Sequence, residues 1–460
     1  MNQSPNPAPL VALRSRRPKR RLVLAALDWT REKDPRVPLG HASLLAALRR
    51  SGAEVSSLTI PLNAPGTTFE TVFTRIVAAL EAIAPADLGI GAYVWNESYL
   101  QRLLPALRAS GYRGRIILGG PQISYQRTDL ESIYPDADIF VRGYGEQVLV
   151  ELLACDKSRP IPGVHWAGND DLGEQAGVQL EELASPFLTG VVDVPRNHRF
   201  LRWETQRGCP YRCSFCQHRE ADARPVRRRF GVDRIDDEIR LFTRHNVRSI
   251  AVLDPVFNLG EHPYDVLDRL RHHRYTGRLS LQCHSDAMRE PERFLRACDG
   301  LDVHLEFGLQ TIHDAEMHAV QRRQNLDRFA SIVDMLHRER RSFEVSVIYS
   351  LPEQTLASFL ETVRWCLRRR IPVIRAYPLV LLRGTQLSAE RARWALREDG
   401  STIPAVVESS TFDRADWHAM AAIADALRRT ESHHPVHLGP LEHMARGAQP
   451  APLLHAPAPA

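Results

Sequence analysis

The sequence predicts an α/β protein in which a doubly wound parallel sheet is followed by a partial barrel of six β/α units and a small helical cap. Strand-like and helix-like segments alternate twice along the 460-residue chain, which is typical of parallel strands. Glycines follow several strands of the first series, where a ligand can approach the backbone. Three of the seven cysteines lie within eight residues, directly after the first strand of the second series.

The first series predicts a doubly wound, Rossmann-like domain over residues 19–156. Strand patterns cover 22–27, 54–61, 88–94, 115–118 and 139–142. Helix patterns cover 39–50, 68–83 and 98–109, and a further helix follows the turn at 143–146 and runs to about 153. No GxGxxG motif follows the first strand, which weakens a dinucleotide-binding interpretation.

The second series predicts an open partial (β/α)6 barrel over residues 199–385. Strand patterns cover 202–206, 249–253, 279–283, 303–307, 343–349 and 373–378. Helix patterns cover 232–245, 264–273, 291–297, 326–338 and 356–369. Barrel enzymes place their chemistry on the loops after the strands, which is where the cysteines lie.

The remaining segments are predicted to support these two domains. The polar, turn-rich stretch 157–198 is interpreted as a linker, and 386–435 as a helical cap. Residues 1–18 and 436–460 are rich in proline and alanine and are predicted to be disordered. The basic run at 14–21 is interpreted as a solvated arm.

Composition and charge predict a cytoplasmic, globular protein. Hydrophobic residues make up 43% and charged residues 25% of the chain, and the net charge is +5. No run of about 18 apolar residues would span a membrane, and the N-terminus lacks the apolar region of a secretory signal. We therefore expect no membrane partner.

The cysteine cluster CPYRCSFC at 209–216 predicts an iron–sulfur site held by Cys209, Cys213 and Cys216. A 4Fe–4S cluster normally takes four thiolates, so three leave one iron open for a reactive ligand. The alternative is a zinc site completed by His218, although CxxxCxxCxH makes an awkward local loop. The other cysteines are interpreted as small buried hydrophobic residues: Cys155, Cys283, Cys298 and Cys366.

With this motif, residues 200–385 resemble the radical S-adenosylmethionine (SAM) superfamily. DPVFN at 254–258, LEFGLQT at 305–311 and IYSLPEQT at 348–355 carry the resemblance, and Ser350 stands where many relatives have glycine. It implies that SAM chelates the open iron, and that most members cleave SAM with an electron from a donor. It also implies cofactor contacts by Phe215, Asp254, Phe257, Asn258, Gln310, Leu351 and Pro352.

Glu306 is a candidate catalytic residue on physical grounds. A carboxylate among apolar strand residues is costly unless it meets a cation, a metal or hydrogen-bond donors. Glu306 could face the SAM ammonium or the open iron. The alternative is a pair with an arginine elsewhere in the barrel.

A doubly wound domain before such a barrel resembles the cobalamin-binding subfamily. Segments 89–96, 118–121 and 141–146 carry this resemblance. They imply cobalamin contacts by Tyr93, Trp95, Asn96, Arg102, Gly119, Gly120, Pro121, Gly143, Gly145 and Glu146. The DxHxxG signature of a histidine-ligated lower face is absent. Arg102 is the candidate neighbour of that face, with a solvent-facing arginine as the alternative.

The resemblance implies a cobalamin-dependent C-methyltransferase of natural-product biosynthesis. Segments 30–43 and 307–313 are similar to the tryptophan 2-C-methyltransferases of thiostrepton biosynthesis. This implies methylation of the indole carbon 2 through methylcobalamin, with Tyr349 as the candidate base. The expected partners are a small-molecule substrate, tryptophan or a related precursor, and an electron donor if SAM is cleaved reductively.

Four alternatives follow from the same residues. One is radical methylation of an sp³ carbon in a peptide or antibiotic precursor, and another is a cobalamin-binding sensor, which would need no open-iron cluster. A methylthiotransferase is disfavoured because no second cysteine triplet is present. RNA modification could use the basic run at 224–229, but no aromatic stacking pattern accompanies it.

Overall fold

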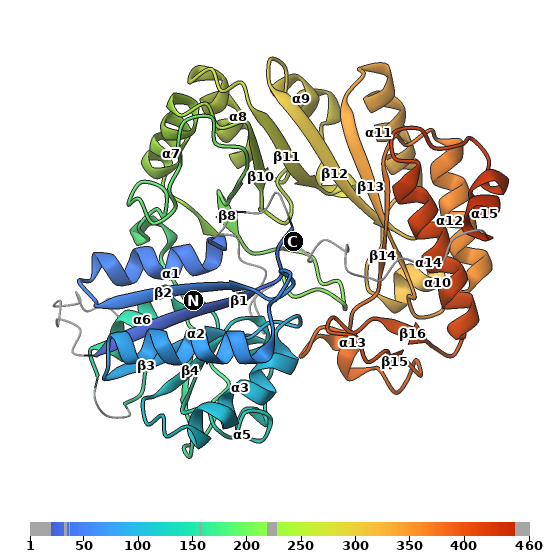
Figure 1. The fold of residues 1–460 in the computed structure, drawn as a ribbon. Coiled ribbons are helices and arrows are strands. Elements are labelled where there is room, and N and C mark those ends of the chain that lie inside the picture. The colour runs from blue at the N-terminus through green and yellow to red at the C-terminus, as the bar shows by residue number, and fades with distance from the viewer. Residues whose placement is uncertain (1–19, 32–34, 36, 156–158, 219–227, 447–460) are drawn as a thin grey trace, which may run out of the picture.

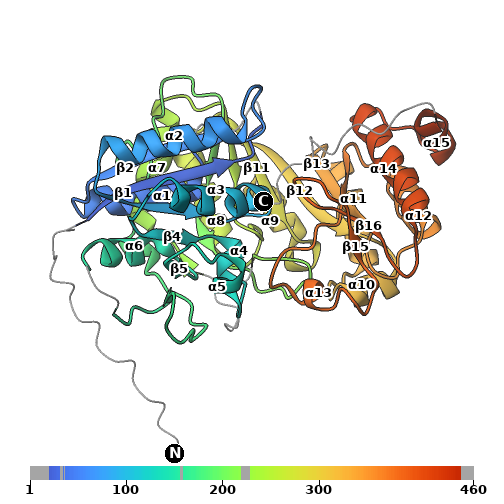
Figure 2. The same cartoon turned by 60° about the horizontal axis from the view of Figure 1, so that its bottom comes forward.

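Two six-stranded sheets, each covered by helices, make up most of the molecule (Figure 1). The computed structural model describes residues 20–31, 35, 37–155, 159–218 and 228–446. The N-terminal sheet and the C-terminal sheet lie next to each other in both views (Figures 1 and 2). No helix of the described ranges is long and apolar enough to cross a membrane.

The first sheet is doubly wound, with strand order β2–β1–β3–β4–β5–β6. Its strands are β1 (Arg21–Asp28), β2 (Val55–Pro61), β3 (Ala86–Gly91), β4 (Ile116–Gly119), β5 (Ile139–Val141) and β6 (Val164–Trp166). All neighbours are parallel except β5 and β6. The five predicted parallel strands are therefore confirmed, and β6 is an addition.

Helices cover both faces of this sheet. The helices α1 (Leu39–Arg50) and α6 (Gly145–Leu153) pack on one face, and α2 (Phe69–Ala82) and α3 (Glu97–Ala109) on the other. The leucines of α3 at 100, 103, 104 and 107 are all buried, which is the spacing of one helical face. Two short helices, α4 (Pro121–Ser124) and α5 (Leu130–Ile133), follow β4.

The second sheet is an open barrel with strand order β14–β13–β12–β11–β10–β7, parallel throughout. Its strands are β7 (Leu201–Trp203), β10 (Ser249–Val252), β11 (Arg278–Cys283), β12 (Asp302–Gln310), β13 (Ser342–Tyr349) and β14 (Ile374–Pro378). Its outer helices are α7 (Val232–Arg244), α8 (His262–His272), α9 (Pro291–Ala297), α11 (Leu326–Arg338) and α12 (Leu356–Arg368). The six predicted strands of the barrel and the five predicted helices between them are confirmed.

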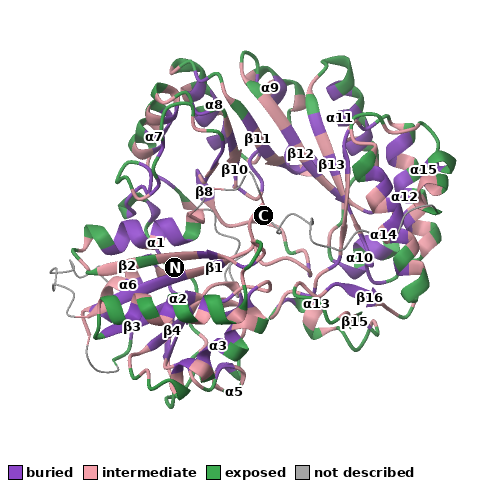
Figure 3. Ribbon diagram, viewed as in Figure 1, coloured by how far each residue is buried: buried purple, intermediate pink, exposed green. Residues whose placement is uncertain are grey.

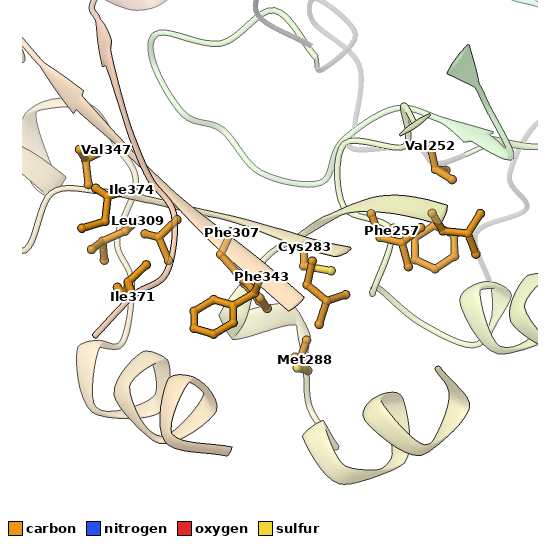
Figure 4. Packing of buried hydrophobic residues seen from close by; sticks show 14 of the residues in the cluster. Val252, Phe257, Cys283, Met288, Phe307, Leu309, Phe343, Val347, Ile371 and Ile374 are labelled. Atoms are coloured by element: carbon orange, nitrogen blue, oxygen red, sulfur yellow. The ribbon is translucent and has the colours of Figure 1, made fainter. Parts of the chain in front are cut away.

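The barrel strands present an apolar face to the helices and a polar face to the interior. Phe307 and Leu309 of β12 and Phe343 and Val347 of β13 are buried toward the helices (Figure 4). The residues between them are only half-buried, which gives the strands their alternating colours in Figure 3. The interior is therefore not a packed core.

The prediction of a linker at 157–198 is wrong. Residues 164–166 form β6 of the first sheet, and six apolar side chains further on are buried in the barrel core: Val178, Leu180, Leu183, Phe187, Val192 and Val194. They are spaced irregularly among polar residues, so no helical or strand period marks them. The segment is a structural part of both domains.

The C-terminal region also differs from its prediction. The cap contains α13 (Gln386–Ala389) and α14 (Arg414–Arg429), but also the antiparallel pair β15 (Arg397–Glu398) and β16 (Val406–Glu408). The tail predicted from 436 begins with α15 (Leu438–Arg446), whose Leu438 and Leu441 are buried. Apolar residues spaced by three provide that contact. Residues 1–18 and 447–460 lie outside the described residues.

Candidate active site

The cysteine loop, residues 208–218, follows β7 and the short strand β8 (Gln206–Arg207) at the carboxyl edge of the barrel. Backbone hydrogen bonds fix its middle. The Ser214 amide donates to the Val320 carbonyl at 2.9 Å, and the Leu387 amide donates to the Ser214 carbonyl at 2.9 Å. The loop is thus held between the end of the short helix α10 (Asp314–Ala319) and the start of α13.

All three cysteine thiols of this loop are half-buried and free of disulfides. Burial raises the pKa of Cys216 to about 12, and the neighbouring Cys213 and Cys209 add to that effect. Arg322 Nη1 approaches Cys213 Sγ at 3.5 Å. Within the described ranges no three His, Cys, Asp or Glu side chains are gathered as metal ligands. Cluster ligation therefore stays a prediction, which rests on thiol donors of suitable number and spacing.

Buried polar atoms without a hydrogen-bond partner collect around this loop. Seven of the fourteen such atoms found among the described residues lie there: Gln206 Oε1, Ser214 Oγ, His284 Nε2, Gln310 Oε1, Arg322 Nε, Gln324 Oε1 and Ser350 Oγ. Most follow barrel strands at their carboxyl ends. A cavity of about 750 Å³, lined in part by Asp286, Gln324 and Glu353, opens at the same edge. Such atoms are usually paired in native proteins, so a polar ligand is expected here.

His284 is the most rigidly held of these residues, and sequence reasoning missed it. Its ring stacks on Tyr211 of the cysteine loop, with centroids 4.1 Å apart. Its Nδ1 accepts from the Asp286 amide at 3.2 Å, which leaves the proton on the unpartnered Nε2. Burial lowers the pKa of His284 to about 3, so the ring is a neutral hydrogen-bond donor. The signal in the sequence was a histidine directly after a barrel strand.

The three predicted residues after β10 are buried and bonded within the protein. Asn258 bridges both backbone groups of His284, at 2.9 and 3.0 Å. Phe257 is in the core, and its amide donates to the Gln282 carbonyl at 2.8 Å. Asp254 accepts from the Thr205 amide at 2.8 Å and from the Thr205 hydroxyl. These residues support the strand ends, and their contact with a cofactor stays a prediction.

Asp254 is expected to make stability depend on pH. Burial raises its pKa to about 7 against the opposing hydrogen bonds of Thr205, whereas an unfolded aspartate titrates near about 3.9. The folded chain therefore binds the extra proton, so this stabilisation is complete below about pH 4 and is lost as the pH rises through about 7. The free energy of unfolding should fall by on the order of 4 kcal/mol over that range.

Urea titrations of the wild type and Asp254→Asn at several pH values measure this contribution. The difference between the two proteins should shrink or change sign as the pH rises, because the amide does not titrate. Parallel pH profiles for the two proteins would contradict the assignment.

Gln310, Phe215, Leu351 and Pro352 lie at the same edge of the barrel. Gln310 ends β12 with a φ of 66°, and Phe215 is half-buried against the barrel core. Leu351 is fully buried, and its amide donates to Gln354 Oε1 at 3.2 Å. The structure brings these residues toward one edge, and their contacts with SAM stay predictions.

Ser350 occupies a backbone conformation that favours glycine. Its φ is 74°, and its buried hydroxyl has no partner among the described residues. Ser350→Gly is expected to raise the free energy of unfolding by about 1 kcal/mol, because both costs are removed. If the hydroxyl contacts SAM, the variant should bind SAM about three- to tenfold more weakly. Urea denaturation and calorimetric SAM titration measure the two effects, and a lower stability would contradict the first.

Tyr349 does not face the barrel interior, so its assignment as the base is wrong. It is 2% exposed and packs between Phe359 of α12 and Trp417 of α14, with centroids 5.9 and 6.3 Å away. Burial raises the pKa of Tyr349 above its ordinary range. A phenol that lies on the helix side of the sheet cannot reach a substrate inside the barrel.

The interior face instead carries Glu306, Glu344, Arg375 and Tyr377. Glu306 is half-buried and in register with Gln282 on one side and Glu344 on the other. Glu344 Oε2 lies 3.4 Å from Arg375 Nε. Burial, then the charge of Glu344, raises the pKa of Tyr377 above its ordinary range, whereas Arg375 and Arg31 oppose the shift. Arg31 follows β1, so the carboxyl edge of the first sheet faces this interior.

At that edge, Tyr93, Trp95 and Asn96 build one compact turn. Tyr93 and Trp95 are stacked with centroids 4.4 Å apart. Asn96 is fully buried: its Oδ1 accepts from the Tyr93 amide at 2.9 Å and its Nδ2 donates to the Gly91 carbonyl at 2.8 Å. Burial raises the pKa of Tyr93 to about 12. Asn96 shapes the turn, and the aromatic pair is the part that remains for a ligand.

The glycines after β4 and β5 make room for the chain itself. A Cβ on Gly120, at φ 88°, would lie 2.8 Å from the Ala92 carbonyl oxygen. A Cβ on Gly143, at φ 77°, would lie 2.5 Å from the Ala176 carbonyl oxygen. The space at Gly120 and Gly143 is thus used by neighbouring backbone rather than by a ligand. Gly119 ends β4, and Pro121 and Gly145 begin α4 and α6; all three are half-buried.

Two other predicted cobalamin contacts have partners in the protein. Arg102 is exposed on α3 and its guanidinium lies over Phe69 of α2, 4.1 Å from the ring centroid. That favours the solvent-facing alternative. Glu146 is 4% exposed and accepts from Ser43 Oγ at 3.0 Å and from Arg207 Nη1 at 2.7 Å. Burial would raise the pKa of Glu146, but Arg207 and these hydrogen bonds hold it below its ordinary range.

Comparison with known proteins relates the second domain to a known superfamily. Residues 203–366 match the family model of the radical SAM superfamily. This match confirms the resemblance to that superfamily inferred from CxxxCxxC and the strand-end segments.

Relatives then place the chain beside the cobalamin-dependent methyltransferases of that superfamily. It is 31% identical over 193 residues to the cobalamin-dependent radical SAM methyltransferase TokK of Streptomyces tokunonensis, which covers 38% of this chain and 28% of TokK. It is 30% identical over 237 residues to a 2-(S-pantetheinyl)-carbapenam-3-carboxylate methyltransferase of Streptantibioticus cattleyicolor. This match covers 47% of this chain and 34% of that relative. The match spans about a third of the length of these curated relatives.

Solved structures share the fold over most of the chain. The radical SAM methyltransferase TsrM of Kitasatospora setae, with tryptophan and a SAM analogue, superposes with a TM-score of 0.66 at 17% identity, covering 95% of this chain and 97% of TsrM. The cobalamin-dependent enzyme OxsB, with aqua-cobalamin and SAM, superposes with a TM-score of 0.64 at 14% identity, covering 90% of this chain and 67% of OxsB.

Proposed function

We propose that this chain is a SAM- and cobalamin-dependent C-methyltransferase with a 4Fe–4S cluster, acting on a small precursor of an antibiotic or related natural product. The observation that carries the proposal is the collection of unpartnered buried polar atoms around the cysteine loop. Each such atom costs about 1–3 kcal/mol. A ligand with several donors and acceptors, as SAM has, would offset that cost.

The residues present suit each of the three cofactors. Cys209, Cys213 and Cys216 supply three thiols on one loop, none of them in a disulfide. For SAM, the donors are His284 Nε2 and Arg322 Nε, and acceptors include Gln310 Oε1. For cobalamin, the first sheet offers the stacked Tyr93–Trp95 pair and the buried, unpartnered Gln122 Oε1. When bound, the cluster and cobalamin would supply the electron and methyl-transfer chemistry, which no side chain provides.

The chain's own residues would orient a substrate and control protons inside the barrel. His304 Nε2 lies 3.3 Å from Glu344 Oε2, and Arg375 Nε lies 3.4 Å from the same oxygen. The pKa of Tyr377 is raised, so its phenol keeps its proton and acts as a hydrogen-bond donor. Polar groups on the interior face would fix a substrate that has polar substituents of its own.

Two substrate classes are supported by different observations. Tryptophan, methylated at indole carbon 2, is supported by the sequence segments 30–43 and 307–313 and by the shared fold of TsrM. A carbapenam-type precursor is supported by the relative at 30% identity, whose name gives a 2-(S-pantetheinyl)-carbapenam-3-carboxylate as its substrate. The absence of Tyr349 from the interior removes one argument for the indole reaction, since no base was otherwise assigned.

An anaerobic assay tests the proposal. The reconstituted protein is incubated with methyl-labelled SAM, hydroxocobalamin and either tryptophan or a carbapenam carboxylate, and the products are analysed by mass spectrometry. Labelled 2-methyltryptophan supports the first substrate, and a labelled carbapenam supports the second. Release of 5′-deoxyadenosine reports reductive SAM cleavage. A protein that binds neither SAM nor hydroxocobalamin after reconstitution would overturn the proposal.

The basic run at 224–229 gives no support to RNA modification. Arg228 and Arg229 form strand β9, which pairs with β8. Arg228 lies over the Tyr144 ring at 5.5 Å, inside the protein's own interface. Residues 224–227 lie outside the described residues.

A further inference from the structure

The first domain contacts the cysteine loop at both of its ends. At the start of the loop, Arg207 donates from Nη1 to Glu146 Oε1 at 2.7 Å and lies over the Tyr144 ring at 5.3 Å. At its end, the Tyr125 hydroxyl donates to the Gln217 carbonyl oxygen. Tyr125, Tyr144 and Glu146 all belong to the first domain. The first domain therefore holds the cysteine loop at both of its ends.

The contact at Arg207 is buried and made by several groups. The side chains of Arg207 and Glu146 are 12% and 5% exposed. Ser43 of α1 donates to the same Glu146 oxygen at 3.0 Å, and Arg207 Nε donates to Glu204 at 3.0 Å. A buried arginine that is hydrogen-bonded to two carboxylates holds its geometry better than an exposed pair.

The positions of these residues along the chain give the contact its significance. Glu146 lies in the first turn of α6, directly after the Gly143–Gly145 turn that the sequence predicts to contact cobalamin. Arg207 stands two residues before Cys209. A movement of that turn would therefore be transmitted to Cys209 through the ion pair between Glu146 and Arg207.

We propose that Arg207 is a positioning residue that couples occupancy of the first domain to the geometry of the cysteine loop. The inference rests on the proposed function, since it needs cobalamin as the occupant. With the first domain occupied, Glu146 holds Arg207 in place and Cys209 is fixed for cluster binding. Without Arg207 the connection between Glu146 and Cys209 is lost, and the contact of Tyr125 at the far end of the loop remains.

Cysteine labelling in the full-length, metal-free protein tests this coupling. The rate of iodoacetamide modification at Cys209, Cys213 and Cys216 is followed by mass spectrometry, with and without hydroxocobalamin. Cobalamin retained after desalting is measured by absorbance. In the wild type, hydroxocobalamin should change the Cys209 rate by at least about fivefold, and in Arg207→Gln by less than about 1.5-fold.

Matched variants separate coupling from general destabilisation. Arg234 is a suitable control, because its side chain is 13% exposed and pairs with buried Glu238 wholly within the barrel domain. Arg234→Gln should respond to hydroxocobalamin as the wild type does. Arg207→Lys should keep part of the response, and Glu146→Gln should lose it. A merely structural role for Arg207 would change the labelling rate equally with and without hydroxocobalamin.

The outcomes distinguish the two proposals. Retained cobalamin with the same response in Arg207→Gln as in the wild type overturns the coupling alone. The coupling alone is also overturned if the wild type retains cobalamin but its Cys209 labelling rate does not change. If the wild type retains no cobalamin, the proposed function and the coupling are both overturned. In reconstituted protein, the cluster's electron paramagnetic resonance spectrum should change on cobalamin addition in the wild type and stay constant in Arg207→Gln.

Discussion

Replacing Cys213 by alanine is expected to abolish both cluster binding and methyl transfer. A 4Fe–4S cluster left with two protein thiolates has lost a third of its protein ligands, and no other cysteine is close in the sequence. Arg322, which approaches the Cys213 sulfur at 3.5 Å, would lose this hydrogen-bond acceptor. We expect iron and sulfide contents near zero after anaerobic reconstitution, and no turnover above background.

Cys298→Ala is the matched control for that experiment. Cys298 is 1% exposed in the barrel core, far in the sequence from the loop. Its replacement should cost about 1 kcal/mol of stability through lost packing and leave the iron content unchanged. Full iron content in Cys213→Ala would contradict the assignment of the cluster to this loop.

The second large effect is a loss of turnover on replacing Tyr377. The corresponding replacement of Tyr349 is the control. Tyr377→Phe removes a phenol from the interior face and should lower turnover about 10- to 100-fold. Tyr349→Phe removes a hydroxyl from the helix side and should leave turnover within about twofold. Both substitutions keep the ring, so neither opens a cavity. Steady-state kinetics with the substrate found by the labelling assay measures both.

The opposite pattern would restore Tyr349 as a reacting group. A loss of activity in both variants with a parallel loss of thermal stability would indicate a folding defect instead. Circular dichroism melting of each variant therefore accompanies the kinetics.

Both sheets and most helices could be predicted because their signals are local. The five parallel strands of the first sheet and the six of the barrel are short apolar runs, and amphipathic helices follow most of them. Parallel strands need such crossovers, so the alternation itself predicts the sheet. The buried segment 178–194 has no regular spacing of apolar residues. Its apolar side chains fill gaps between helices and strands, and the segment forms no long helix or strand of its own.

The direction of Tyr349 could have been predicted from the strand alternation. Phe343, Val345 and Val347 share one face of β13, and Tyr349 continues that series. On β14, Tyr377 shares the face of polar Arg375. The resemblance to a family indicated which strand end mattered, whereas the pleat decides which side chains enter the site.

Contacts between the domains could not be predicted. Glu146 and Arg207 are 61 residues apart, and each alone reads as an ordinary surface charge. The unpartnered atoms of His284 and Ser350 are likewise visible only once the strands are side by side. The residues that surround the candidate site were therefore predicted as loops, and their chemistry came from the structure.

The burial of residues 178–194 in the barrel has a consequence for recombining domains between related enzymes. A hybrid joined at residue 198 would pair a foreign barrel with apolar side chains shaped for this one. Ala176 belongs to the core of the first sheet and Val178 to that of the barrel. A crossover point at 176–178 would divide the chain where its two cores meet, and hybrids joined there should be recovered in soluble form more often.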